Sequence, residues 1–212
     1  MPNRSASVAG GSQGGVAFSE RMAGWFALGE RDPSAGAAAG EAARTTLALE
    51  ARVAIPDVRR FAADPEHAGD LGGAVTFAPL GVSMPVSSGY VRLFVASSDP
   101  ELKRMVYRVT FAGPGGEHCF DGEKLVRRHS MLHGWADTTT LYGRLYAGPD
   151  ATGTPVGAGV LRLTPASFAR QLVSFRTLEA RTLADRARAL GGFFTFFAGE
   201  LIDSYLWRTR SR

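Results

Sequence analysis

The chain has 212 residues, of which 45% are hydrophobic and 21% are charged. This balance is typical of a folded domain with a sizeable core and argues against a disordered chain. The formal net charge is +4, but the basic residues are scattered along the chain, so we expect no binding to nucleic acid. Cys119 is the single cysteine, which excludes an internal disulfide and predicts a reducing, cytoplasmic location.

The first residues differ in composition from the rest. Residues 1–15 are rich in Gly and Ser and lack the apolar core of a signal peptide, so we predict a flexible lead-in. No later window approaches the roughly eighteen apolar residues that a membrane-spanning helix needs. The length of the remainder allows one large domain or two small ones. Because strand patterns follow one another without a break, we predict a single domain over residues 16–212.

Eight stretches have the composition of β-strands. They cover residues 16–28, 45–55, 74–77, 86–96, 103–111, 120–128, 138–147 and 156–164. The clearest pattern lies in 45–55, where alternate apolar residues such as Leu47 and Leu49 face away from Glu50 and Arg52. Turn-forming residues separate neighbouring strands, as at Pro114. This spacing predicts a mainly β (α+β) fold built on an antiparallel β-barrel of about eight strands.

Helical spacing is concentrated near the end of the chain. A short helix is predicted over residues 56–64, and a longer one begins at Pro165, after which Phe168 recurs with Leu172 on one face. A final helix is expected from residue 182 to 205, weakened by two adjacent glycines. We therefore place C-terminal helices, residues 165–207, against the barrel. Residues 34–40, rich in Gly, Ala and Pro, are assigned only as a connection.

The last helix carries the most apolar patch of the chain. Its four phenylalanines are Phe193, Phe194, Phe196 and Phe197. One interpretation is that they pack on the barrel or over its mouth. The other is that they dock onto a partner or a membrane surface, which the basic residues that follow would support. Those residues are Arg208, Arg210 and Arg212.

Strong catalytic and metal-binding motifs are missing. The sequence has no nucleophile elbow, metalloprotease helix, phosphate loop or dinucleotide fingerprint. His118 precedes Cys119, and His129 lies four residues before His133, but a metal site needs more ligands at workable spacing. We expect neither a metal nor a cofactor.

Two charged residues fall on strand faces that otherwise read as buried. Glu20 is in register with Phe18, and Lys124 is in register with Phe120. A charge on a buried face must be paired, hydrated or used. The two side chains can therefore meet inside the barrel, either as a structural ion pair or as the catalytic residues of a site.

Aromatic and polar residues can complete such a site. Tyr107, Tyr142 and Tyr146 occupy positions that can point inward, and Trp135 and Asp137 precede a strand at the mouth. These five are the candidate substrate-binding residues, because phenol and indole groups both shape an apolar cavity and orient a ligand. A slip of one residue in strand register would turn any of them outward.

Three stretches carry a resemblance to a known family. They are Phe18-Ser19-Glu20-Arg21-Met22-Ala23-Gly24-Trp25-Phe26, then Asp137-Thr138-Thr139-Thr140-Leu141-Tyr142, and finally Gly159-Val160-Leu161 leading to Pro165 and Phe168-Ala169-Arg170-Gln171-Leu172. Through them, most of residues 16–205 resembles a β-rich segment of bacterial cholesterol-oxidase-like oxidoreductases of the glucose-methanol-choline type. The flavin-binding domain of those enzymes is absent from this sequence, so oxidase activity is not implied. The resemblance implies a stand-alone relative, or a partner domain, concerned with sterol-like or other lipophilic molecules.

These observations predict a barrel that binds a hydrophobic small molecule such as a polyketide, terpenoid, sterol or lipid. If the protein is an enzyme, we expect cofactor-free cyclisation or isomerisation, with Glu20 moving a proton and Lys124 as its charge partner. Two alternatives stay open. One is a non-catalytic module that docks onto an oxidoreductase or hydrolase, and the other is a lipid-binding protein attached to a membrane surface by its last helix.

Overall fold

The computed structural model describes residues 14–127, 134–180 and 182–206, with side chains over residues 14–127, 136–180 and 182–203. The strands are β1 Gly15–Leu28, β2 Thr46–Ile55, β3 Ala68–Phe77, β4 Gly81–Ala96, β5 Leu102–Gly113, β6 Gly116–Arg127, β7 Thr140–Ala147, β8 Gly157–Arg162 and β9 Arg176–Leu178. The helices are α1 Pro33–Ala43, α2 Val58–Ala63, α3 Gly134–Thr139, α4 Pro165–Ser174 and α5 Leu183–Leu206. The predicted lead-in at residues 1–15 lies almost wholly outside the described residues, as do Arg208, Arg210 and Arg212.

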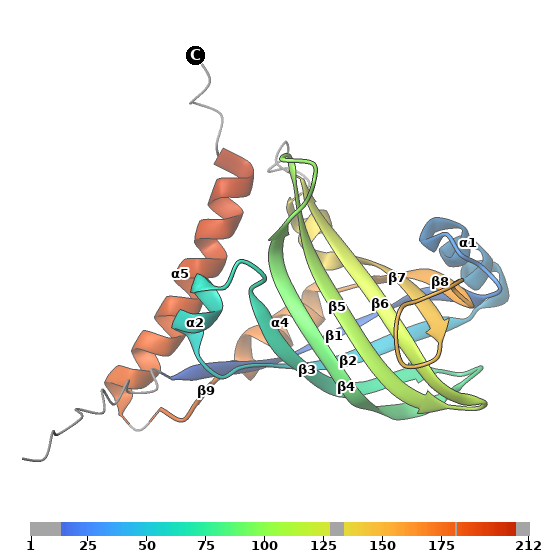
Figure 1. Ribbon diagram of the computed structural model, residues 1–212, viewed down its shortest axis with the longest axis horizontal. Helices are drawn as coiled ribbons and strands as arrows, with labels where there is room; N and C mark the ends of the chain where they lie inside the picture. Colours follow the sequence, from blue (N-terminus) through green and yellow to red (C-terminus); the bar gives the residue numbers. More distant parts are fainter. Residues whose placement is uncertain (1–13, 128–133, 181, 207–212) are drawn as a thin grey trace, which may run out of the picture.

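The strands form a closed antiparallel barrel (Figure 1). Each of β2 to β7 pairs with the next strand along the chain, β8 pairs with β1, and β1 pairs with β2 to close the ring. The predicted eight-stranded barrel is therefore confirmed. A ninth strand, β9, adds to the outside edge of β1. Closure leaves no long strand edge open for unwanted pairing.

Strand β1 pairs with two different strands along one of its edges. Its second half pairs with β8 from Ala23 to Leu28, and its start pairs with β9 from Gly15 to Ala17. Helix α4 packs against the segment in between, where the amide of Ser19 donates a 2.8 Å hydrogen bond to Ser174 Oγ. On this edge, α4 therefore covers the part of β1 that pairs with neither β8 nor β9, next to Glu20.

One end of the barrel interior is filled by aromatic side chains. Phe26, Phe77, Phe111 and Phe120 are fully buried, and the ring of Phe26 lies 5.3 Å from that of Phe77 and 6.2 Å from that of Phe120. Gly143 makes room for this packing, because a Cβ there would lie 2.5 Å from Phe120 Cε2. The filled end leaves any open interior to the other end.

Helix α1 occupies the segment that the sequence assigned only as a connection. Asp32 caps it by accepting from the amides of Ser34 and Ala35, and Pro33 provides a suitable first turn. Gly36 and Gly40 face the barrel, where added Cβ atoms would lie 2.1 Å from Ala158 O and 2.4 Å from Phe26 N. The glycines that obscured the helical pattern are what let this helix approach the strands.

Helix α5 lies on the opposite side of the molecule from α1 (Figure 1). Phe193 is 2% exposed, the ring of Phe196 lies 5.1 Å from Phe61, and the ring of Phe197 lies 5.0 Å from Phe94. Lys103 Nζ also pairs with Glu200 Oε2 at 2.5 Å. The interpretation that the helix packs on the barrel is confirmed. Its assigned span is continuous across both adjacent glycines.

The predicted starts of four strands differ from the structure by two residues or more. The largest error is in β3, which begins at Ala68 in place of residue 74, and β4 and β6 also begin earlier than predicted, at Gly81 and Gly116. The seventh strand instead begins later, because the chain makes helix α3 where we predicted a strand from residue 138, so β7 begins at Thr140. None of the helices in the described parts of the chain is both long and apolar enough to cross a membrane.

Candidate functional site

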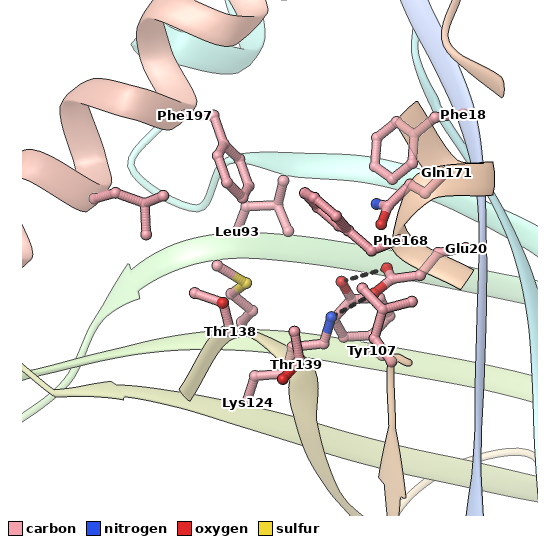
Figure 2. Close-up of a pocket in the computed structure, with 13 residues that line it drawn as sticks. Phe18, Glu20, Leu93, Tyr107, Lys124, Thr138, Thr139, Phe168, Gln171 and Phe197 are labelled. Atoms are coloured by element: carbon pink, nitrogen blue, oxygen red, sulfur yellow. Dashed lines mark hydrogen bonds and ion pairs between the residues drawn. The ribbon is translucent and has the colours of Figure 1, made fainter. Parts of the chain in front are cut away.

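A cavity of about 310 Å³ lies beside α4 and α5. Figure 2 shows side chains from strands and helices converging on it. Its apolar lining consists of Phe18, Leu93, Met105, Leu163, Phe168, Phe197 and Leu201, and its polar lining of Glu20, Tyr107, Lys124, Thr138, Thr139 and Gln171. An apolar hollow with a few fixed polar groups is the usual form of a small-molecule site.

Glu20 and Lys124 meet at this cavity as an ion pair. Lys124 Nζ donates to Glu20 Oε1 at 2.5 Å. Lys124 is 2% exposed and Glu20 is 3% exposed. Strand alternation explains their position, because Glu20 follows Phe18 on the inner face of β1, as Lys124 follows Phe120 on β6. The expectation that they meet inside is confirmed, whereas their catalytic role stays a prediction.

Tyr107 completes the polar group. Its hydroxyl donates to Glu20 Oε2 at 3.0 Å, and Lys124 Nζ lies 4.7 Å from the centre of its ring. Burial raises the pKa of Tyr107 well above its ordinary value, and the negative charge of Glu20 and the hydrogen bond to it raise the pKa further. Tyr107 therefore stays protonated at neutral pH and acts as a hydrogen-bond donor, not as a base.

The hydrogen bonds to Glu20 determine how its carboxylate can exchange a proton with a ligand. Both carboxylate oxygens have a donor, Lys124 on Oε1 and Tyr107 on Oε2. A carboxylate held in this way can accept a proton from a ligand and return it, while the ammonium group balances its charge in surroundings of low polarity. No such triad was expected, because sequence alone did not link Tyr107 to the other two residues.

Gln171 is a polar residue of the cavity that the sequence reasoning missed. It lies three residues after Phe168 on α4, so one helix face carries both side chains to the cavity (Figure 2). Its Oε1 atom is buried and has no hydrogen-bond partner among the residues that the structure describes. The signal was present in the sequence, as an amide at helical spacing from an apolar residue.

Two predicted tyrosines lie elsewhere. Tyr142 and Tyr146 are half-buried and alternate along β7 with Leu141 and Leu145, which are fully buried. The inner face of this strand thus carries the leucines, and Gly143 between them packs on Phe120. The expectation that these tyrosines point inward is wrong by one step of register.

Of the two residues predicted at the mouth, Asp137 falls outside the cavity lining. Asp137 lies on α3, where its Oδ2 accepts from the Arg127 amide at 3.3 Å, and it borders a small outer hollow with Tyr142. Trp135 belongs to the same helix, but its side chain is outside the described residues. Thr138 and Thr139 are the residues of α3 that line the cavity.

A second hollow, of about 300 Å³, lies outside the barrel between α4 and strands β1 and β2. Most of the residues that line it are of polar type, among them Arg21, Arg52 and Arg170, and Arg21 Nε lies 3.6 Å from Glu50 Oε1. Glu20 borders this groove as well as the inner cavity. The strand segment that carries Glu20 thus separates an apolar interior from a polar surface groove.

Within the described residues, no group of three or more His, Cys, Asp or Glu side chains is placed to hold a metal ion. His118 stacks on Phe111 with ring centres 5.9 Å apart, and His129 and His133 lie outside the described residues. Burial raises the pKa of the Cys119 thiol to about 11 against the opposing effect of Arg108. This thiol is therefore not an activated nucleophile at neutral pH.

Comparison with protein families, with curated proteins and with solved structures finds no match to this chain. The cavity and its polar group are therefore the features of this protein that bear on its function.

Proposed function

We propose that the protein binds a hydrophobic small molecule in the barrel cavity and catalyses its isomerisation or cyclisation without a cofactor. The observation that carries the proposal is the buried Glu20–Lys124–Tyr107 group at the wall of an apolar hollow. We also propose a cytoplasmic location, which the lone cysteine supports.

A purely structural ion pair is the main alternative to a functional one. Buried ion pairs are weak sources of stability, because desolvation of both charges offsets most of their attraction. Apolar residues of similar volume would fill the interior at least as well. The pair here borders open space that a ligand can occupy, and this position supports a role in binding or catalysis.

The cavity volume supports a particular size of ligand. An engineered cavity of about 150 Å³ holds one benzene molecule, and this cavity is about 310 Å³. A compound with two fused rings, or a chain of similar bulk, would fit inside. A four-ring sterol would extend beyond this volume, so we favour a small terpenoid or polyketide over the sterol that the family resemblance implies.

The proposed isomerisation is balanced without an oxidant or reductant. Glu20 removes a proton from a carbon next to a polarised double bond, the double bond moves, and the same carboxyl returns the proton to another carbon. Lys124 keeps its charge and stabilises the carboxylate and the ligand anion. In a cyclisation, the apolar wall would hold a flexible chain near its reactive geometry.

The test is turnover of the compound that co-purifies with the protein. Glu20→Gln should lower the rate by about 10²-fold or more, the range typical of a lost general base, and Tyr107→Phe should lower it by a smaller factor. Tyr146→Phe is the matched control, since it removes a tyrosine hydroxyl outside the cavity, and it should leave the rate unchanged. Unchanged turnover in folded Glu20→Gln and Tyr107→Phe would overturn the catalytic proposal.

A further inference from the structure

The cavity contains a polar atom whose hydrogen-bonding capacity is unused by the protein. Gln171 Oε1 is buried and unpartnered among the described residues, and Figure 2 shows the amide reaching from α4 into the side chains around the cavity. An unsatisfied buried carbonyl is unfavourable, because it has lost its hydrogen bonds to water without gaining others. An atom of this kind beside an open hollow is a ready position for a ligand donor.

The other residues that line the cavity require the rest of the ligand to be hydrophobic. Phe18 and Phe168 lie near Gln171, and Leu93, Met105 and Phe197 continue an apolar surface. By contrast, both oxygens of the Glu20 carboxylate already have donors within the protein. Gln171 Oε1, however, has no donor within the part of the chain that the structure describes, so a ligand can supply its first hydrogen bond.

We infer that the natural ligand is a hydrophobic alcohol whose hydroxyl donates to Gln171 Oε1. The inference rests on the proposed binding function and narrows its substrate class. A hydroxyl suits an amide well because it can donate to the carbonyl and accept from the amino group. A site built to hydrogen-bond a hydroxyl rejects an analogue that lacks it, because the acceptor is then left unpaired. Gln171 is accordingly a specificity-determining residue.

The experiment compares two probes of two-ring size, naphthol and fluoronaphthalene substituted at the same ring position, by equilibrium dialysis against the purified full chain. The informative quantity is the ratio of their dissociation constants, measured in the wild type and in Gln171→Met. Because each probe serves as its own reference, differences in their solubility cancel between the two proteins. The preference for naphthol should fall about tenfold in Gln171→Met, the loss expected for one hydrogen bond.

Met105→Leu is the control, since it alters the same cavity without touching a polar group, and it should change the affinity for both probes alike. If both probes bind and the ratio is the same in wild type and Gln171→Met, the hydroxyl assignment is wrong while the binding function stands. If the wild type binds neither probe, both the assignment and the proposed binding function are contradicted.

Discussion

Lys124 Nζ and Glu20 Oε1 lie 2.5 Å apart, although the two residues are separated by 104 positions in the sequence. Strands β1 and β6 are not paired with each other in the sheet. The contact therefore spans the interior of the barrel and depends on closure of the ring. It links the fold directly to the candidate site, because the same two side chains line the cavity.

Breaking this pair should destabilise the protein more than removing it altogether. Lys124→Met leaves a buried carboxylate without its charge partner and should lower the free energy of unfolding by about 3–5 kcal/mol. Glu20→Leu combined with Lys124→Met should recover most of that loss, because no buried charge is left. Urea denaturation of the wild type, both single variants and the double variant measures the effect. A double variant as unstable as the sum of the singles would contradict a coupled pair.

Tyr107 should make stability sensitive to alkaline pH. Its pKa in the folded protein is raised above the ordinary value of 10.0 by burial and by Glu20, so the folded state holds this proton more tightly than the unfolded state. The resulting stabilisation is present below about pH 10 and is lost as pH rises above it. Thermal unfolding across this range should show a steeper decline for the wild type than for Tyr107→Phe. Equal slopes would show that Tyr107 does not titrate in this way.

Cys119 should react slowly with thiol reagents in the folded protein. It is fully buried, and burial raises its pKa to about 11, so little thiolate exists at neutral pH. Reaction with a disulfide reagent, followed by absorbance, should accelerate strongly when urea unfolds the chain. Comparable rates in native and denaturing buffer would place this thiol at the surface instead.

Replacing glycine by alanine at two different positions should have opposite effects on the stability of the protein. In Gly40→Ala the added carbon would lie 2.4 Å from Phe26 N, so α1 must move off the barrel and stability should fall. In Gly191→Ala nothing lies within 4 Å of the added carbon, and Ala is favoured over Gly inside a helix by about 0.8–1.0 kcal/mol. Melting temperatures should therefore fall in the first variant and rise in the second. A rise in both would contradict the close packing of α1.

Strand alternation carried most of what the sequence could predict. Charged residues in step with buried apolar ones placed Glu20 and Lys124 inside, because the pattern of each strand is unambiguous over several residues. The alternation did not predict the orientation of Tyr142. Residues 141, 142, 145 and 146 are all apolar or aromatic, so both faces of this strand have the composition of a buried face. Sequence alone also gave no distance between strands, so the contact between Tyr107 and Glu20 emerged only once the barrel closed.

Helices were harder to predict where their formation depends on packing against the barrel and not on the helix propensity of their residues. The glycines of α1 are poor helix formers, and only their contact with β1 and β8 explains the helix. The sequence did not single out Gln171, because a polar residue on a short helix is expected to face solvent until the helix is placed beside the cavity.

The most direct test of ligand binding is native mass spectrometry of the purified chain beside Leu93→Trp, whose larger side chain would fill the cavity. Circular dichroism should first establish that the variant is folded, since overpacking is unfavourable by about 1–3 kcal/mol. We predict that the wild type carries an additional mass, that extraction releases a lipophilic alcohol, and that Leu93→Trp carries none. A wild type without any bound compound, which also takes up none from a lipophilic extract, would contradict a binding function for this cavity.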